Sequence, residues 1–218
     1  MTKLKKIILI GPPGSGKGTQ ATQLAAHYDI PSISTGHILR EEVRLQSSLG
    51  KKIQETIESG ALVSDEVMIK LIEQRLNHED CNNGFILDGF PRTLSQAQAL
   101  SQSNLGINFV FYMRLDDLIL IERLSGRRVH EGSGRSYHIL YNPPKQEGLD
   151  DVTHEPLVQR VDDHPENIKR RLVYFHQLTT PVIEYYETKQ KQLDLCFKTI
   201  DAHQEISLLT MEIIEIIK

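Results

Sequence analysis

Cysteine is scarce in this sequence. Its 218 residues include only two, Cys81 and Cys196, and neither belongs to a Cys-x-x-Cys pair. Structural zinc sites and redox motifs usually need such a pair, so both are disfavoured. We expect two reduced thiols, which are typical of a cytoplasmic protein.

Long apolar runs are also missing. The run near the N-terminus, Ile7 to Ile10, is ended by Gly11-Pro12-Pro13. It is too short for the core of a signal peptide or for a membrane span. We therefore expect no membrane partner.

Excess positive charge is the third absence. Lys and Arg number 25 against 29 Asp and Glu, which gives a formal net charge of −4. General nucleic-acid binders are usually basic, so no nucleic-acid partner is expected. A protein with a net negative charge that binds polyanions must concentrate its positively charged side chains in one place. The hydrophobic fraction of 39% is enough to bury a core.

What the sequence does have is an alternation of short apolar runs with helical patterns. Continuous apolar strands separated by helices predict a parallel sheet covered on both faces, the α/β doubly wound class. Strands are predicted at 7–10, 85–88, 109–113 and 195–200, with a short one near 30–34, and helices at 17–28, 64–76 and 202–217.

Two segments interrupt this alternation. Residues 36–60 are helical in pattern but more polar than helices packed on a sheet. Residues 126–163 contain several glycines and prolines around the run Tyr137 to Tyr141. This second segment predicts a small β-rich insertion outside the main sheet.

The strongest functional signal follows the first predicted strand and reads Gly11-Pro12-Pro13-Gly14-Ser15-Gly16-Lys17-Gly18-Thr19. Its glycines let the backbone curl so that N–H groups point inward, and the helix that begins near Lys17 adds its positive end. Lys17 supplies a charge to the β- and γ-phosphates of a nucleotide. A glycine-rich turn without a ligand is the alternative. It is disfavoured because strand, glycines, lysine and helix occur together.

A second motif is the run Asp88-Gly89-Phe90-Pro91-Arg92 at the end of another predicted strand. An acidic residue there, beside a phosphate loop, can orient Mg²⁺ directly or through water. A lone Asp at a strand end is more often a helix cap or turn residue. The residues that follow it and the upstream loop favour the functional interpretation.

Arginines scattered along the sequence are the candidates for the concentrated positive charge that would bind phosphates. Each alone would be interpreted as a solvated surface residue. Phosphoryl transfer, however, leaves charge on the migrating group, and guanidinium groups match that charge. The candidates are Arg40, Arg92, Arg123, Arg127, Arg160 and Arg171.

Taken together, these motifs resemble bacterial adenylate kinases of the long-lid type over essentially the whole chain. The resemblance rests on the Lys-Gly-Thr form of the phosphate loop, Ser34-Thr35-Gly36, the run 88–92, Gly126-Arg127-Arg128 and the run 141–144. It implies the P-loop nucleoside-monophosphate kinase fold with a five-stranded parallel sheet. The implied core is 1–33, 64–125 and 164–218, with a helical AMP-binding lobe at 34–63 and a lid at 126–163.

The resemblance also implies an activity, namely reversible Mg²⁺-dependent transfer of the terminal phosphoryl group of ATP to AMP. The two products are ADP, and the role is adenine nucleotide homeostasis and biosynthesis. The partners would be ATP, AMP and ADP. Because the sequence shows no long apolar edge and no heptad pattern, we also expect a monomer.

Site residues follow from the resemblance position by position. The implied catalytic residues are Lys17, Asp88, Arg92, Arg123, Arg127, Arg160 and Arg171. The implied ATP-binding residues are Gly14, Ser15, Gly16, Lys17, Gly18, Thr19, Arg123, Arg127, Ser136, Tyr137 and Gln204. The implied AMP-binding residues are Thr35, Arg40, Ala61, Leu62, Val63, Gly89, Phe90, Pro91, Arg92, Gln96, Arg160 and Arg171. Magnesium would be held through the nucleotide and water near Thr19 and Asp88.

The sequence departs from the resemblance at three places. His37 stands where many relatives have Asp, and its plain interpretation is a helix-start residue. Ala202-His203-Gln204 replaces the usual Gly-x-Lys of the adenine loop. In the lid, the places of zinc ligands are taken by His130, Ser133, Asp150 and Thr153, so we expect a hydrogen-bonded lid without structural zinc.

Two alternatives remain open at this point. One is a related phosphotransferase with another acceptor or donor, such as UMP, CMP or GTP. The other is a nucleotide-binding module without catalysis, which the intact Lys17, Asp88 and arginine set argue against.

Overall fold

A five-stranded sheet forms the centre of the computed structural model, which describes residues 4–103 and 105–218. All of its strand pairs are parallel, in the order β2-β3-β1-β4-β7. This confirms the predicted five-stranded parallel sheet; residues 1–3 of the predicted core lie outside the described residues. The strands are β1 (Lys5–Ile10), β2 (Ser32–Ser34), β3 (Gly84–Asp88), β4 (Phe109–Arg114) and β7 (Cys196–Asp201).

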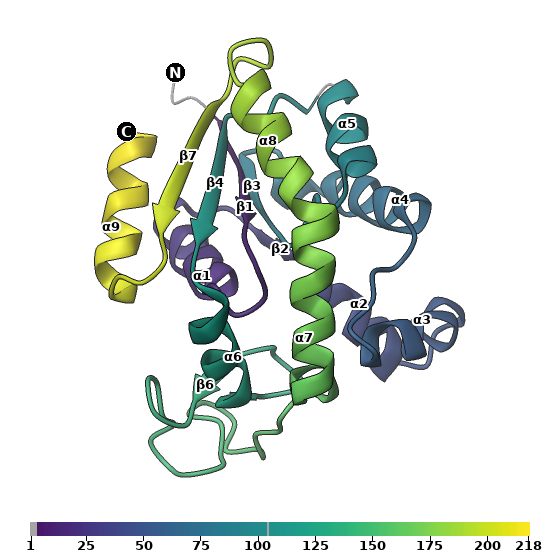
Figure 1. The fold of residues 1–218 in the computed structure, drawn as a ribbon, viewed down its shortest axis with the longest axis vertical. Helices are drawn as coiled ribbons and strands as arrows, with labels where there is room; N and C mark the ends of the chain where they lie inside the picture. The colour runs from purple at the N-terminus through teal and green to yellow at the C-terminus, as the bar shows by residue number, and fades with distance from the viewer. Residues whose placement is uncertain (1–3, 104) are drawn as a thin grey trace.

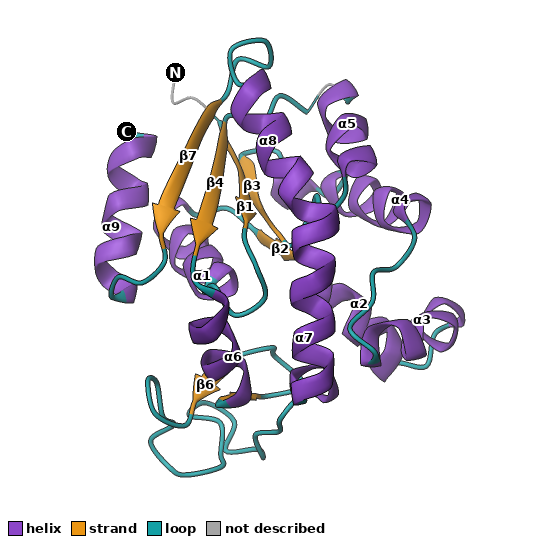
Figure 2. Cartoon of the chain, viewed as in Figure 1, coloured by secondary structure: helices purple, strands orange, loops and turns teal. Residues whose placement is uncertain are grey.

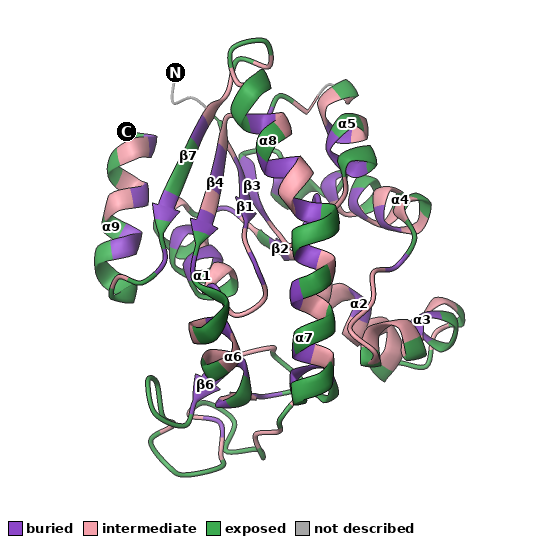
Figure 3. Ribbon diagram, in the orientation of Figure 1, coloured by how far each residue is buried: buried purple, intermediate pink, exposed green. Residues whose placement is uncertain are grey.

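Both faces of the sheet are covered by helices (Figure 2). Ile7 and Leu9 of β1 point into one apolar cluster, and Ile8 and Ile10 point into the other. This explains why the strands are apolar throughout, and Figure 3 shows β1 and β3 largely buried. The first cluster includes residues of α1 (Lys17–Tyr28), α6 (Asp117–Ser125), α7 (Pro165–Tyr174) and α9 (Ile206–Ile217); the second includes residues of α4 (Asp65–Leu76), α5 (Leu94–Gln102) and α8 (Thr180–Lys189).

Residues 34–63, here called the α2–α3 lobe, stand beside the sheet (Figure 1). The helical segment predicted at 36–60 is two helices, α2 (Thr35–Arg44) and α3 (Ser48–Glu58). The chain turns at Gln46, whose φ is 51°, and the Ser47 side chain caps α3. The two helices pack so closely that a Cβ at Gly50 would lie 2.0 Å from the Glu42 carbonyl oxygen. This contact requires glycine.

Residues 126–163, here called the β5–β6 insertion, form the second lobe. The strands β5 (Arg127–Val129) and β6 (Ser136–His138) pair antiparallel and belong to no part of the main sheet. The rest of the insertion is loop and turn, up to the 3₁₀ turn η2 (Val161–Asp163). It lies beyond α6, at the carboxyl end of the sheet (Figure 1).

A continuous helical rod follows the insertion. It consists of α7, the π-helical turn η3 (Phe175–Thr179) and α8, and runs along the molecule in Figure 1. The Thr179 hydroxyl donates to the Arg92 carbonyl oxygen at 2.9 Å, so the π turn touches the predicted site. The remaining short helix is η1 (Glu79–Cys81).

The C-terminal helix begins later than predicted. Residues 201–204 form a turn in which the His203 amide donates to the Asp201 carboxylate at 3.0 Å. The helix therefore starts at Ile206 instead of 202. Across residues 4–103 and 105–218, no helix is long and apolar enough to cross a bilayer.

Candidate active site

The phosphate loop joins β1 to α1 in the conformation that its glycines allow. Gly14 and Gly16 have φ values of 85° and 92°, which residues with a side chain rarely adopt. Gly16 is the N-cap of α1, its end has no side-chain cap, and its first turn has no acidic residue. The first amides of α1 are therefore available to an anion, which the helix dipole also favours.

Lys17 is folded back over this loop. Its ammonium donates to the Pro12 carbonyl oxygen at 2.8 Å and to Ser15 Oγ at 3.4 Å. The pKa of Lys17 is lowered to about 8, chiefly by burial, with a smaller lowering by Arg92, Arg171 and Arg127 that Asp88 opposes. The negative charge of a phosphate at this position would raise the pKa of Lys17 and favour its charged form.

Asp88 ends β3 next to the start of α1. A Cβ at Gly18 would lie 3.4 Å from Asp88 Oδ2, so this carboxylate faces the α1 backbone. Gly18, which separates Lys17 from Thr19, therefore lies at the contact between α1 and the Asp88 carboxylate. Asp88 also lies directly beside Leu9 in the sheet register, at the carboxyl end of both strands.

Gly89 is the centre of a second polar site. Its carbonyl oxygen accepts from Thr35 Oγ1 at 3.0 Å and from Arg92 Nε at 2.7 Å. Its φ is 79°, and a Cβ there would lie 2.9 Å from Arg92 Nη2. Glycine at this position therefore lets α2 and the Arg92 guanidinium approach the end of β3 together.

Gln96 holds this arrangement from behind. Its side-chain oxygen accepts from the Arg92 amide at 2.7 Å, and its amide nitrogen donates to Asp65 Oδ1 at 2.8 Å. The Thr93 hydroxyl donates to the other Asp65 oxygen at 2.9 Å. Sequence reasoning placed Asp65 in the helix predicted at 64–76 and gave it no role in the site, because its partners lie in α5 and in the loop before it.

A pocket opens between the α2–α3 lobe and the end of the sheet. Nine of the twelve predicted AMP-site residues line it; Phe90 and Pro91 are buried, and Arg160 is not among the lining residues. The lining combines polar and charged side chains with apolar ones, which suits a ligand with a charged group and a flat ring. The lining residues are Thr35, Gly36, Leu39, Arg40, Ile57, Gly60, Ala61, Leu62, Val63, Met68, Gly89, Arg92, Gln96, Asp162 and Arg171.

Positive side chains converge between this pocket and the phosphate loop. The pKa of Arg40 is lowered to about 10, first by burial and then by Arg127, Arg171 and Arg92, against Asp162. Burial, Arg127 and Arg40 lower the pKa of Arg160 well below its usual value. Five of the six predicted arginines thus lie near one another: Arg92, Arg127 and Arg171 are close enough to lower the pKa of Lys17, and Arg40 and Arg160 lie beside these three.

Two carboxylates that sequence reasoning missed organise these arginines. Asp163 has no exposed side-chain surface and pairs with Arg127 at 2.5 Å and with Arg171 at 2.8 Å. Arg171 also contacts Asp162 at 3.2 Å. By contrast, Arg160 Nε is buried without a hydrogen-bond partner in the described part of the chain. The adjacent pair Asp162-Asp163, which begins two residues after Arg160, was the available signal.

Arg123 lies apart from the other five. Its Nη2 donates to the Ala202 carbonyl oxygen at 3.2 Å, which joins α6 to the turn after β7. The Gln204 side chain is directed to Glu212 of α9 at 2.8 Å. The structure therefore brings Arg123 to the predicted adenine loop and leaves the Gln204 side chain outside it.

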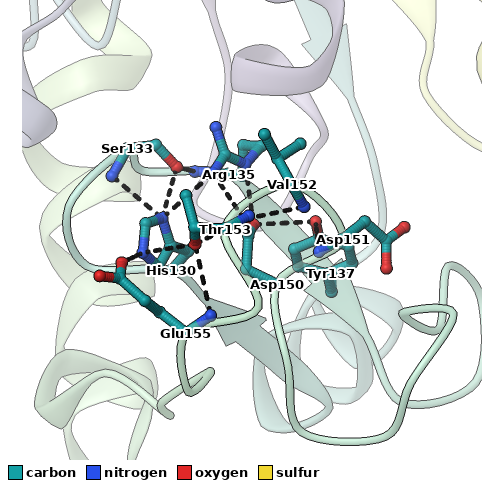
Figure 4. Close-up of polar contacts among 9 residues, drawn as sticks. All are labelled: His130, Ser133, Arg135, Tyr137, Asp150, Asp151, Val152, Thr153 and Glu155. Carbon is teal, nitrogen blue, oxygen red and sulfur yellow. Dashed lines mark hydrogen bonds and ion pairs between the residues drawn. The ribbon is translucent and has the colours of Figure 1, made fainter.

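The β5–β6 insertion is held together by a polar network (Figure 4). Asp150 is buried and accepts from Arg135, from the Tyr137 hydroxyl at 2.9 Å and from the Thr153 hydroxyl at 3.0 Å. These bonds, Arg135 first, hold the pKa of Asp150 well below its usual range. His130 lies between Ser133 Oγ at 2.8 Å and Glu155 Oε2 at 2.5 Å.

This network contains all four residues that occupy the places of zinc ligands, and it adds Arg135, Tyr137 and Glu155, which sequence reasoning did not assign to it. In the described ranges, no group of three or more His, Cys, Asp or Glu side chains could hold a metal ion. Ser136, in contrast, is exposed on β6.

The parallel sheet, its uncapped glycine loop and the arginines gathered beside a second pocket define a P-loop nucleotide-binding protein. A family model described as adenylate kinase matches residues 9–191. The chain belongs to the adenylate kinase family.

Two curated relatives extend the match to nearly the whole chain. The adenylate kinase of Blochmanniella pennsylvanica (strain BPEN) is 45% identical over 213 residues, 97% of this chain and 98% of that protein. The adenylate kinase of Baumannia cicadellinicola subsp. Homalodisca coagulata is 48% identical over 212 residues, 97% and 99% of the two chains. The relationship therefore includes both lobes as well as the sheet.

Proposed function

We propose that this chain catalyses the reversible transfer of the terminal phosphoryl group of ATP to AMP, with two ADP as products. The observation that carries the proposal is the cluster of five arginines and Lys17 between the phosphate loop and the pocket at Gly89. A cluster between two binding places suits two nucleotides whose phosphates meet end to end.

The two places are assigned from their linings. ATP would place its phosphates on residues 14–19, with Arg123, Arg127, Ser136, Tyr137 and the backbone near Gln204 on its far side. AMP would fill the pocket, with Thr35, Arg40, Arg92 and Arg171 around its phosphate and residues 61–63 along its base. Arg160, whose buried Nε has no hydrogen-bond partner among the described residues, would contact a phosphate from the side of the insertion.

The protein's part in catalysis is positioning and charge neutralisation. The AMP phosphate attacks the γ-phosphorus in line and ADP leaves, with no covalent intermediate on the chain. The arginine fork at each phosphate holds the attacking and leaving groups and neutralises the charge that spreads over the migrating group. Lys17, freed from Pro12 and Ser15, would contact the β- and γ-phosphates.

Magnesium fits the oxygen groups at this place. Asp88 presents a carboxylate beside the start of α1, and Thr19 presents an exposed hydroxyl. These two residues would hold Mg²⁺ through water and the nucleotide, where the ion would offset phosphate charge.

The lobes would act as closing elements around the core of residues 1–33, 64–125 and 164–218. We assign 34–63 as the AMP-binding lobe and 126–163 as the lid. Their closure would exclude water, which would otherwise take the phosphoryl group. The polar network around Asp150 supports this role, because it makes the insertion a body that can move as a unit.

We also propose a cytoplasmic monomer. Cys81 and Cys196 are free thiols, which suits a reducing compartment. The sequence shows no heptad pattern and no long apolar edge that would require a partner subunit.

The test is a coupled assay of the purified chain with ATP, AMP and Mg²⁺, extended to UMP and CMP as acceptors and GTP as donor. The proposal predicts ADP formation with AMP far above the other acceptors, and its loss in Lys17→Ala. Lys145→Ala, an exposed residue of the insertion, is the matched control. Preference for another acceptor, or tight ATP binding without ADP formation, would contradict the proposal.

A further inference from the structure

His37 reaches from the α2–α3 lobe to the β5–β6 insertion. It is the third residue of α2, whose first residue Thr35 is bonded to Gly89 at the end of the sheet. A Cβ built at Gly134 would lie 3.0 Å from His37 Nδ1 and 3.4 Å from its Cε1. The imidazole therefore packs directly on the backbone of the turn between β5 and β6.

The turn is shaped to receive this ring. Gly134 has a φ of 72°, and its amide donates to the His130 carbonyl oxygen at 2.9 Å. His130 is itself fixed by Ser133 and Glu155, so the turn is held from within the insertion. A side chain at position 134 would occupy the space where the ring lies.

The charged groups that face His37 come from both the α2–α3 lobe and the β5–β6 insertion. On α2 they are Arg40, Arg44 and Glu41, and from the end of the insertion comes Arg160. Glu131, on the same turn as Gly134, attracts Arg44 across the boundary. Burial in this place, followed by Arg40, lowers the pKa of His37, and Glu41 opposes the shift only in part.

We propose that His37 is a positioning residue that joins the α2–α3 lobe to the insertion, docking on the turn at Gly134 when its imidazole is neutral and separating the two bodies when it is protonated. The inference rests on the proposed function, since it assumes that both lobes enclose the nucleotides. A protonated ring would add a positive charge beside Arg40 and Arg160, and the three like charges would repel one another.

The direction of the pH effect follows from the lowered pKa. A histidine with a lower pKa in the joined arrangement favours that arrangement above its ordinary pKa of about 6.5. The contribution is lost as the pH falls through that value, and closing releases a proton. Nucleotide phosphates at Arg40 and Arg160 would offset the effect of these two arginines on His37, so the pH effect in the complex rests on burial of the ring against the turn, the largest cause of the lowered pKa.

The experiment measures the affinity of the full chain for a bisubstrate nucleotide, two adenosines bridged by five phosphates, at about pH 8 and pH 5.5. Variants are His37→Gln, which keeps a polar side chain without titration, and His78→Gln, an exposed histidine at the end of α4. Wild type and His78→Gln should lose roughly fivefold more affinity on acidification than His37→Gln. An equal loss in all three would overturn the inference.

A second arm tests the contact itself at about pH 8. Gly134→Ala should weaken bisubstrate binding, and His37→Ala in the same background should recover part of the loss because the ring is no longer in the way. Simple addition of the two losses would contradict a direct contact. If wild type bound no bisubstrate nucleotide at either pH, the proposed function would fail instead, so the two failures are distinguishable.

Discussion

The carboxylate of Asp163 accepts two hydrogen bonds from the Arg127 guanidinium, at 2.8 Å from Nε and 2.5 Å from Nη2. The same carboxylate pairs with Arg171, so one buried anion orients two arginines that approach it from the insertion and from α7. This relationship makes the end of the β5–β6 insertion part of the site.

Asp163→Asn should destabilise the protein and reduce activity. The change would leave Arg127 and Arg171 buried beside a neutral group, which typically costs about 3–5 kcal/mol in unfolding free energy. Urea unfolding followed by circular dichroism measures this loss. Asp80→Asn, which breaks a surface pair with Arg75, is the control and should cost much less. Equal effects of the two changes would contradict the assigned role.

Arg92→Lys should raise the KM for AMP by about tenfold or more and lower kcat. Arg92 uses Nε to bind the Gly89 carbonyl oxygen at 2.7 Å, which leaves the fork directed to the pocket. Lysine keeps the charge but cannot make both contacts. Steady-state kinetics at varied AMP measures the effect, with Arg75→Lys, a partly buried arginine that pairs with Asp80 outside the pocket, as the control. Unchanged kinetics in Arg92→Lys would remove this residue from the AMP site.

Nucleotide binding should take up a proton at Lys17. Its pKa is lowered to about 8 in the free site, chiefly by burial, and triphosphate oxygens would raise it. Near pH 8.5 much of Lys17 is neutral before ATP binds and charged afterwards. Calorimetry in buffers of different ionisation enthalpy reports the uptake. It should vanish in Lys17→Met and persist in Lys145→Met; persistence in both would contradict the prediction.

The β5–β6 insertion should lose its order in acid before the sheet does. Arg135 and the other donors lower the pKa of Asp150, so its contribution is present above the usual Asp range and is lost as the pH falls below about 4. Asp150→Asn should make residues 126–163 sensitive to protease at neutral pH. The measurement is hydrogen exchange of the insertion in Asp150→Asn and in the control Glu147→Gln, which alters an exposed residue of the same segment. Equal protection in both variants would show that the network is dispensable.

The sheet and the phosphate loop were predictable because they depend on local pattern. Apolar runs such as 7–10 and 85–88 can be buried on both sides only in a covered parallel sheet, and the structure confirms this. The break between α2 and α3 was not predictable in the same way. It depends on the contact of Gly50 with the Glu42 backbone, which exists only once both helices have packed.

The residue types of the site could be predicted from the sequence. The contacts between those residues could be predicted less well. The residues supplying positive charge were identified, and five of the six arginines converge. The partners that orient them were missed: Asp163 binds Arg127 from 36 positions along the chain, and Gln96 binds Asp65 from 31. The hydroxyl of Tyr137, expected on the ATP side, is directed to Asp150. Long-range pairings of this kind depend on the folded arrangement, which spacing alone does not encode.

The most direct test uses ATP that carries an isotopic label in its γ-phosphoryl group. This ATP is mixed with AMP, Mg²⁺ and the purified chain, and the position of the label is followed. The proposed function predicts that the label appears at the β-position of the ADP formed from AMP, with two ADP for each ATP consumed. Label released as inorganic phosphate, or retained in bound ATP without ADP, would contradict direct transfer between two nucleotides held by Lys17, Arg92 and the paired arginines at Asp163.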